Sequence, residues 1–340
     1  MSDIQLTTVI FIASGALSFL SAPLFSLLLI PIAKRIGAID VPKDARRMHT
    51  RPIARIGGVA VFLSFLLGAA AVSVFCTPFF TDDTRSLLLA LAVGGTVTVL
   101  GGLADDIYKL SPWQKILYQA LAATSAAACG IRLFGGAIGV IGFILWSVLL
   151  SNAFNLIDGL DGLCTGASAF SLLALIAISG GEPATVILLA AALGFLPLNL
   201  RPARLFLGDA GAMLLGFSLS VLSARCFYSA PRVSTAASLL LMLALPLFDT
   251  AFATLRRIIN GRNPFAPDRE HIHHRLVDSG LSHGRASLLL ILLSGGFASL
   301  GTTVFFTGFS FASLILSSLL IFPTASVIMM GKRRRMKDKF

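Results

Sequence analysis

Long apolar runs separated by short polar segments dominate this chain. A helix needs about 20 mainly apolar residues to cross the hydrocarbon core of a bilayer, and residues 133–157 carry no charge at all. About eleven such runs predict transmembrane helices, near residues 8–30, 56–77, 86–103, 113–130, 137–155, 163–180, 184–199, 212–230, 236–255, 286–306 and 309–330. The runs are continuous and do not alternate with period two, which favours helices over the strands of a membrane barrel. We therefore predict an all-α, polytopic membrane protein.

Composition agrees with this fold class, because 56% of the 340 residues are hydrophobic and only 13% are charged. We expect one transmembrane catalytic domain over residues 1–331 and a basic cytoplasmic tail over 332–340. The first run has no Lys or Arg before it, so we expect a retained helix and not a cleaved signal peptide.

The basic residues predict the orientation. Placing the N-terminus outside and the C-terminus inside puts all but four of the 27 Lys and Arg residues in cytoplasmic segments, as the positive-inside rule requires. The same arrangement puts all but four of the 16 acidic residues on that face. A basic loop surface ordinarily sets topology and contacts anionic lipid, but it does not require paired carboxylates. We therefore expect the polar chemistry on the cytoplasmic face.

The first acidic motif is LADDIYKL (103–110), where Asp105 and Asp106 close the third run and Lys109 and Lys115 follow. Adjacent carboxylates at a membrane surface repel each other unless a cation or a metal compensates them. An isolated pair of this kind is also typical of a solvated loop with a helix cap at Asp106.

The second motif is NAFNLIDGLDGL (152–163), which ends the fifth run. Its oxygen-bearing side chains are spaced three apart and would be neighbours on a helix: Asn152, Asn155, Asp158 and Asp161. Gly159 and Gly162 let the backbone turn and approach a ligand closely. Such a set suits a hard, oxygen-seeking cation.

Two further motifs lie on the same face. In RLFLGDAGAMLLGF (204–217), Asp209 is a metal-ligand candidate or a plain helix N-cap, and Phe206 is able either to stack on a base or to anchor at the membrane interface. The segment PDREHIHHRL (267–276) carries His271, His273, His274 and Arg275. Its arginine and histidine donors suit phosphate oxygens, while a metal site and a solvated loop remain alternatives.

Together with DVPKDARRMHTRPIARIGG (40–58), these four motifs resemble the polyprenyl-phosphate N-acetylhexosamine-1-phosphate transferases. This membrane family includes phospho-N-acetylmuramoyl-pentapeptide transferase and the UDP-N-acetylglucosamine:undecaprenyl-phosphate transferases. The resemblance covers nearly the whole chain. The HIHHRL form looks like the N-acetylglucosamine branch that starts O-antigen, enterobacterial common antigen or teichoic acid synthesis. Arg47 and Ala212 depart mildly from the family pattern, and neither change removes a ligand.

The resemblance implies an enzyme of the bacterial inner membrane with its active site on the cytoplasmic face. It would transfer a sugar-1-phosphate, GlcNAc-1-phosphate first among the candidates, from a UDP-N-acetylhexosamine to undecaprenyl phosphate and release UMP. The implied cofactor is Mg²⁺, with Mn²⁺ as a substitute. Membrane lipids are expected partners, a homodimer is left open, and no nucleic acid is expected.

The resemblance also implies roles for the site residues. Asn155 and Asp209 look like the metal ligands, and Asp105 and Asp106 would steer the lipid phosphate. Asp105 is also cast in the family as a proton acceptor, although a phosphate monoester with a second pKa of about 6 is already mostly dianionic at neutral pH. Asp158 and Asp161 would shape the uridine and metal site, and Lys115 would contact phosphate. Phe206 would stack on uracil. The pyrophosphate would be held by His271, His273, His274 and Arg275. We count His273 with the catalytic residues.

Alternative functions make different demands on the sequence. The same reaction with another UDP-N-acetylhexosamine or with UDP-MurNAc-pentapeptide would need the same motifs. A secondary transporter would carry ionisable residues near the middle of broken helices, and Asp249 after Pro246 is the residue of that kind. A CDP-alcohol phosphotransferase would continue its Asp-Gly motif into Ala-Arg, whereas Asp161 and Gly162 continue into Leu163.

Overall fold

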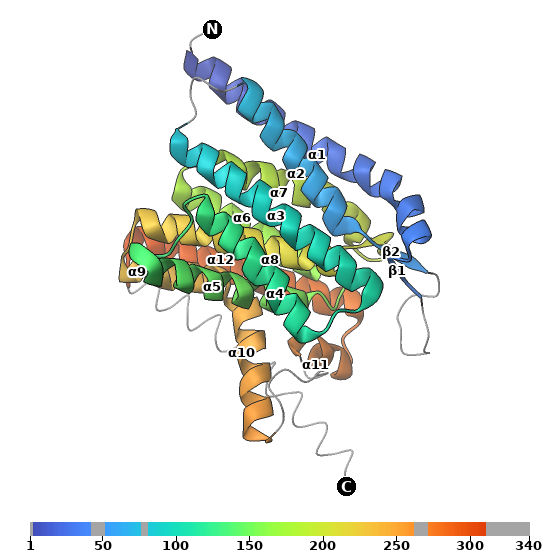
Figure 1. Cartoon of the computed structure of the whole chain (residues 1–340). Coiled ribbons are helices and arrows are strands. Elements are labelled where there is room, and N and C mark those ends of the chain that lie inside the picture. The colour runs from blue at the N-terminus through green and yellow to red at the C-terminus, as the bar shows by residue number, and fades with distance from the viewer. Residues whose placement is uncertain (1–2, 42–51, 76–80, 262–270, 311–340) are drawn as a thin grey trace.

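The computed structural model describes residues 3–41, 52–75, 81–261 and 271–310. These residues form long helices that run side by side, with three short strands at one end (Figure 1). The helices are α1 (Asp3–Ile36), α2 (Gly57–Phe75), α3 (Asp82–Tyr108), α4 (Pro112–Ala128), α5 (Gly136–Ile157), α6 (Leu163–Ser179), α7 (Pro183–Asn199), α8 (Gly208–Ser229), α9 (Val233–Met242), α10 (Ala244–Ile259), α11 (Ile272–Asp278) and α12 (His283–Thr307).

The apolar runs of the sequence coincide with these helices, apart from 309–330, which lies outside the described residues. Among the described residues, six helices are long and apolar enough to cross a membrane: α1, α2, α3, α5, α8 and α12. A seventh crossing is available if α9 and α10 are counted as one bent span, while α6 and α7 are shorter apolar helices. The helical membrane architecture is therefore confirmed, whereas the number of eleven spans and the orientation stay predictions.

A small sheet was not predicted. Strand β1 (Ile39–Asp40) pairs antiparallel with β2 (Ile53–Arg55), which pairs parallel with β3 (Leu205–Phe206). Strands of two or three residues show no readable alternation in the sequence, so hydrophobic periodicity missed them. The sheet matters because its register places Arg55 opposite Phe206, although the two residues are far apart in the chain.

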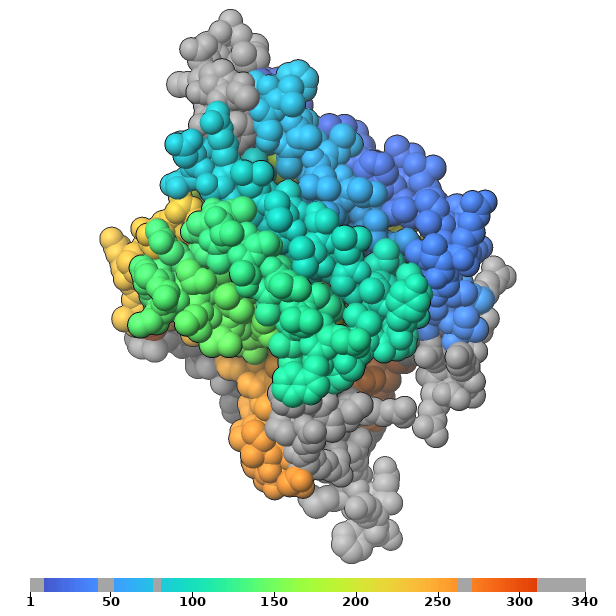
Figure 2. Space-filling model, in the orientation of Figure 1, coloured from blue at the N-terminus to red at the C-terminus, as the bar shows by residue number. Residues whose placement is uncertain are grey.

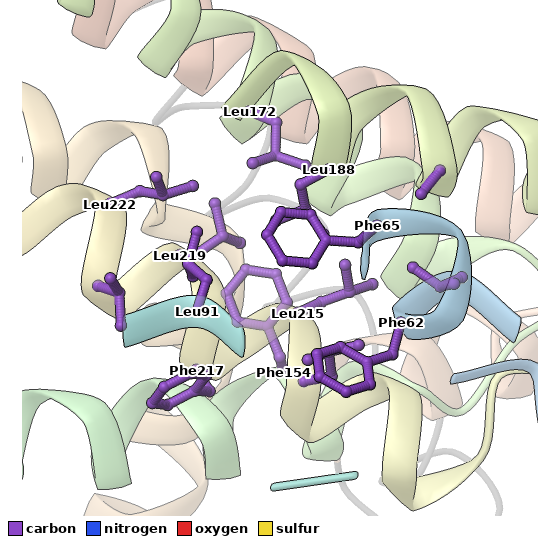
Figure 3. Close-up of a cluster of buried hydrophobic side chains, with 14 of the residues drawn as sticks. Phe62, Phe65, Leu91, Phe154, Leu172, Leu188, Leu215, Phe217, Leu219 and Leu222 are labelled. Carbon is purple, nitrogen blue, oxygen red and sulfur yellow. The ribbon is translucent and has the colours of Figure 1, made fainter. Parts of the chain in front are cut away.

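Helix α8 lies at the centre of the bundle, and almost its whole length up to Ala224 is buried. Around it, buried phenylalanine and leucine side chains from several helices interlock, among them Phe62 and Phe65 of α2, Phe154 of α5 and Phe217 of α8 (Figure 3). Lipid is as apolar as these side chains, so the free energy that holds the helices together comes from close packing of complementary surfaces.

Three helices approach each other through their backbones beside the strands. A Cβ on Gly58 of α2 would lie 2.1 Å from the backbone nitrogen of Gly211 in α8. A Cβ on Gly102 of α3 would lie 2.4 Å from Cα of Ala210. Small residues permit this approach, as is common between membrane helices. The end of α3 and the start of α8 are thereby held together.

Helix α10 leaves the bundle. It is bent by 80° from α9 at a one-residue break and protrudes from the body of the molecule (Figures 1 and 2). Its buried stripe includes Leu245, Asp249, Ala253 and Arg257, spaced by four residues. Large apolar side chains, such as those of Phe252 and Ile259, are exposed on the helix, so one side of α10 faces the protein and the other is free to contact lipid.

Candidate active site

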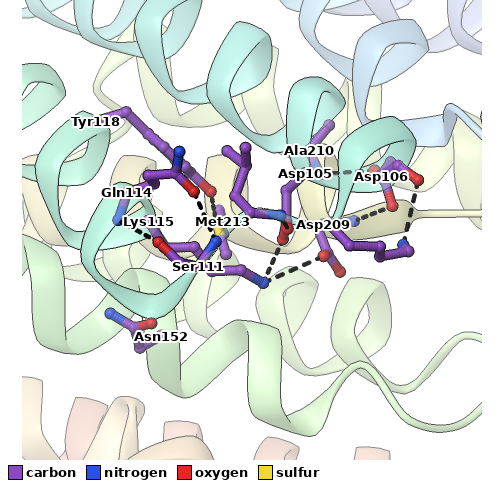
Figure 4. A network of polar contacts seen from close by, with 12 residues as sticks. Asp105, Asp106, Ser111, Gln114, Lys115, Tyr118, Asn152, Asp209, Ala210 and Met213 are labelled. Atoms are coloured by element: carbon purple, nitrogen blue, oxygen red, sulfur yellow. Dashed lines mark hydrogen bonds and ion pairs between the residues drawn. The ribbon is translucent and has the colours of Figure 1, made fainter.

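An ion cluster joins the end of α3, helix α4, the start of α8 and strand β2. Figure 4 shows its carboxylates, Asp105, Asp106 and Asp209, around Lys115. The guanidinium of Arg55 bridges two carboxylates, because its Nε lies 3.0 Å from Oδ1 of Asp106 and its second terminal nitrogen lies 3.0 Å from Oδ1 of Asp209. Lys115 of α4 contacts Asp105, and its Nζ lies 3.6 Å from Oδ2 of Asp209. Three carboxylates and two cations thus share one site, with Asp209 between the cations.

The Asp106 carboxylate is also the cap of α8. Its two oxygens accept hydrogen bonds from the backbone nitrogens of Asp209 and Ala210, each at 3.2 Å. A carboxylate there satisfies unpaired N–H groups and complements the positive end of the helix dipole. Gly208 has φ of +75°, and a Cβ on it would lie 2.7 Å from Oδ2 of Asp106. Glycine at this position lets the carboxylate reach the helix end.

Asp105 and Asp106 are buried, whereas the two cations reach solvent, with about a quarter of each side chain exposed (25% for Arg55 and 23% for Lys115). The interpretation of the pair as a solvated loop is therefore wrong. Asp105 also accepts a hydrogen bond of 2.8 Å from the backbone nitrogen of Leu110, which fixes the turn into α4. The cations are the groups through which the cluster is open to an anion from outside.

The Asn-Asp motif is not a continuous helical array. Helix α5 ends at Ile157, so Asp158 is its C-cap and Asp161 lies in the following turn. Asn152 points toward α4, where its side chain donates to Oε1 of Gln119 at 2.7 Å. The prediction that all four side chains line one helix is wrong, because Gly159 and Gly162 end the helix early.

The two aspartates of the motif have different surroundings. Burial raises the pKa of Asp158 well above that of an ordinary carboxyl, and although Arg55 lowers it, Asp209 and Asp106 raise it further. Asp161 instead faces the segment before β3, where its Oδ2 accepts from the backbone nitrogen of Ala203 at 3.4 Å. Asp158 thus belongs electrostatically to the ion cluster, while Asp161 fixes the neighbouring loop.

Burial decreases the pKa of Arg55, but Asp106 and then Asp209 outweigh it, so its pKa is raised above the ordinary value. The guanidinium therefore remains charged throughout the usable pH range. A permanent cation at this position compensates the carboxylates whether or not a ligand is bound.

The histidine segment lies against the Asp-Gly turn. His273 is buried, and a Cβ on Gly159 would lie 2.1 Å from its Nε2. Burial, and secondarily His274, lower the pKa of His273 to about 3. His271 is buried against Asp249 of α10, while His274 is exposed and Arg275 is half-buried. The structure thus brings the second and fourth motifs together.

Phe206 is half-buried in β3, and Asn199 at the end of α7 holds that strand. The Asn199 amide donates to the carbonyl oxygen of Leu205 at 3.1 Å and accepts from the Thr165 hydroxyl at 3.0 Å.

Asn155 is half-buried in the last turn of α5. Helix α5 packs along α8, and Asp209 lies in the first turn of α8.

Comparison with known proteins identifies the family. A model of glycosyl transferase family 4 matches residues 88–226. A probable undecaprenyl-phosphate N-acetylglucosaminyl 1-phosphate transferase of Bacillus subtilis is 35% identical over 326 residues, covering 89% of this chain and 88% of the relative. The chain belongs to this family of transferases.

Two other relatives extend the match. The undecaprenyl-phosphate alpha-N-acetylglucosaminyl 1-phosphate transferase of Thermotoga maritima is 33% identical, covering 85% of this chain and 89% of its own. The decaprenyl-phosphate N-acetylglucosaminephosphotransferase of Mycobacterium tuberculosis is 32% identical, covering 89% of this chain and 84% of its own. The family resemblance inferred from the motifs is confirmed.

Magnesium in this family member stays a prediction, and the donor chemistry of the site fits it. In the described part of the chain no three or more His, Cys, Asp or Glu side chains form a metal cage. Mg²⁺ usually takes one or two carboxylates and completes its shell with substrate phosphates and water. Asp209 and Asn155 supply oxygens of the required kind, and both residues are half-buried.

Arg55, Asp249 and Asn199 were not predicted to belong to this site. Arg55 was one of several basic residues in a loop, and nothing in its spacing singled it out. Asp249 gave a readable signal, because a lone carboxylate inside an apolar run is rarely without a function. Asn199 lies at the end of an apolar helix, where the sequence has no feature that indicates a contact with a strand.

Proposed function

We propose that this protein transfers GlcNAc-1-phosphate from UDP-GlcNAc to undecaprenyl phosphate and releases UMP. The observation that carries the proposal is the ion cluster of Arg55, Asp105, Asp106, Lys115 and Asp209, in which both cations are partly exposed. The choice of reaction is supported by membership in a family whose relatives are named as undecaprenyl-phosphate N-acetylglucosaminyl 1-phosphate transferases.

In the proposed reaction an oxygen of the lipid phosphate attacks the β-phosphorus of the nucleotide sugar. A new P–O–P bond forms, the bond from the β-phosphorus to the bridging oxygen breaks, and that oxygen leaves with UMP. Several negative charges meet in this step, so positioning and charge compensation are the main tasks of the protein. Arg55 and Lys115 are the cations that can turn toward phosphate oxygens, since both already reach solvent.

Asp105 and Asp106 hold these cations in place. Asp105 fixes Lys115, and Asp106 fixes both Arg55 and the start of α8. The contact of Asp105 with Lys115 favours a positioning role for Asp105 over that of a proton acceptor, because the lipid phosphate needs little help to ionise at neutral pH.

Asp209 and Asn155 would hold Mg²⁺, which would neutralise phosphate charge and lower the cost of bringing the two substrates together. Mn²⁺ would be a substitute with the same oxygen ligands. Asp158 and Asp161 would shape the uridine and metal side of the site.

The nucleotide would lie between the remaining motifs. Phe206 would stack on uracil, and the histidine segment with Arg275 would hold the pyrophosphate. His273 stays neutral above pH 5 because of its low pKa, so it would act as a hydrogen-bonding group and not as a cation. The water-soluble nucleotide and the membrane-bound lipid would meet at the cytoplasmic face of the bacterial inner membrane. A homodimer is compatible with this scheme but not required by it.

The test is UMP release by purified protein in detergent micelles containing undecaprenyl phosphate. UDP-GlcNAc, UDP-GalNAc, UDP-QuiNAc, UDP-FucNAc and UDP-MurNAc-pentapeptide are compared at equal concentration, with and without MgCl₂. We expect UDP-GlcNAc to give the highest kcat/KM and a lipid-linked product of matching mass. The Asp209→Asn variant, folded as judged by its melting curve, should lose roughly 10²-fold or more in kcat. UMP release without undecaprenyl phosphate, or equal activity of Asp209→Asn, would contradict the proposal.

A further inference from the structure

The strongest unassigned feature is a buried aspartate–histidine pair that joins α10 to the histidine segment. Asp249 lies in the buried stripe of α10, and only 5% of its side chain and 5% of the His271 side chain are exposed. Its Oδ2 lies 2.9 Å from Nδ1 of His271. An ionisable side chain buried within a span of this kind is expensive and is ordinarily functional.

Both oxygens of Asp249 are used. Oδ1 accepts a hydrogen bond of 2.8 Å from the backbone nitrogen of Ile272, the first residue of α11. His271 is the N-cap of that helix but makes no side-chain capping bond. The carboxylate on α10 therefore caps α11 from outside. One side chain fixes the start of α11 and the ring that precedes it.

The geometry also determines the proton on the ring. A carboxylate accepts hydrogen bonds, so the His271 nitrogen facing it is the one that carries a proton. Nε2 is then left for other contacts, in a direction fixed by Asp249. The His271 and His273 rings lie parallel, with 5.9 Å between centroids and 4° between planes, so the orientation of one ring limits that of the next.

We propose that Asp249 is a positioning residue that sets the tautomer and orientation of His271, and through His271 the nucleotide-binding geometry of the histidine segment. The functional half of this inference rests on the proposed transferase activity. The tautomer itself does not, because it is a property of the unliganded protein.

The direct test is ¹⁵N NMR of protein labelled at histidine, of which the chain has five residues. The His271 signals are assigned from the spectrum of His271→Asn. In the wild type we expect Nδ1 to carry the proton. In Asp249→Asn the amide nitrogen can face the ring as a donor, so the proton should leave Nδ1. A wild-type ring protonated only on Nε2 would overturn the inference, and this measurement needs no variant of Asp249 to fold.

The functional test is a double-mutant cycle on UMP release. Asp249→Asn should lower kcat/KM for the UDP-sugar roughly 10- to 100-fold, as for other carboxylates that orient functional histidines. The double variant Asp249→Asn/His271→Asn should be no slower than His271→Asn alone, because Asp249 acts through the ring. If the losses of kcat/KM in the two single variants multiply in the double variant, Asp249 does not act through His271. Asp82→Asn, an exposed carboxylate at the start of α3, is the control and should leave kcat/KM unchanged.

The two proposals fail in different ways. If no UDP-sugar yields UMP, the proposed transferase function is lost while the NMR result still decides the tautomer. If UMP is released but the ring is protonated only on Nε2, the function stands and the role of Asp249 falls.

Discussion

Replacing Arg55 by leucine tests the ion cluster most directly. The substitution removes the cation that lies 3.0 Å from both Asp106 and Asp209 and leaves Lys115 to compensate three carboxylates. Removing one partner of a buried ion pair costs roughly 3–5 kcal/mol. A quarter of the Arg55 side chain is exposed (25%), and solvent screening reduces the expected loss to about 2–4 kcal/mol.

The assay is unfolding in detergent together with UMP release. Arg55→Leu should unfold several degrees earlier than the wild type, and its kcat/KM should fall roughly 10²-fold or more, because the cation that we propose contacts substrate phosphate is lost. The stability and the kcat/KM of Arg55→Lys should lie between those of the wild type and Arg55→Leu, since an ammonium group cannot bridge two carboxylates as the guanidinium fork does. Arg35→Leu, at the exposed end of α1, is the matched control and should change stability by no more than about 0.5 kcal/mol.

A second substitution separates charge compensation from packing. In Arg55→Leu/Asp106→Asn one stranded charge is gone, and the single asparagine oxygen still accepts from one of the two backbone N–H groups that Asp106 caps, while the other loses its acceptor. The double variant should recover about 1 kcal/mol or more relative to the sum of the single losses. Strictly additive losses would show that Arg55 and Asp106 do not stabilise each other and would refute the reasoning.

Three further predictions follow from single contacts. Gly159→Ala should displace His273, whose Nε2 would lie 2.1 Å from the new Cβ, and lower kcat/KM at least tenfold by UMP assay; Gly142→Ala, whose Cβ would make its closest contact at 3.4 Å, should be neutral. The pKa of His273 is about 3 in the folded protein and 6.5 in the unfolded chain, so the unfolded state binds a proton first as pH drops. The free energy of unfolding should therefore fall by about 1.4 kcal/mol per pH unit between those values. The melting temperatures of wild type and His273→Gln should converge from pH 7.5 to 5, and a constant difference between them would contradict this. Asn199→Leu should weaken UDP-sugar binding and cost about 1–3 kcal/mol by stranding the Leu205 carbonyl and the Thr165 hydroxyl; unchanged KM in a folded variant would exclude a role in holding β3.

Much of the fold follows from one-dimensional pattern, because a bilayer imposes length and apolarity on every span. The helices α2, α5 and α12 could be located from the sequence within a few residues for this reason. The break between α9 and α10 could not, since an 80° bend leaves the hydrophobic run uninterrupted. The short strands were also invisible, because they are defined by pairing across the chain and not by local composition.

The site was predictable where its residues form compact motifs. Asp105, Asp106, Lys115 and Asp209 come together as expected, since their motifs lie at neighbouring helix ends. Arg55 could not be singled out, because one arginine among several in a loop acquires its role only from the register of β2 with β3. The helical array in the Asn-Asp motif failed because spacing alone does not reveal where a helix ends.

The glycine contacts among α2, α3 and α8 set limits for redesign of this enzyme. Gly58 meets Gly211, and Gly102 meets Ala210, with no room for a larger side chain on either glycine. The carboxylates beside them are consequently carried on backbones that cannot be moved apart by exchanging side chains. An engineer seeking acceptance of a different sugar would leave these three helices untouched and would vary the loop that carries Ala203 and the short helix α11 that carries His274, where a change in shape does not break the junction of the helices.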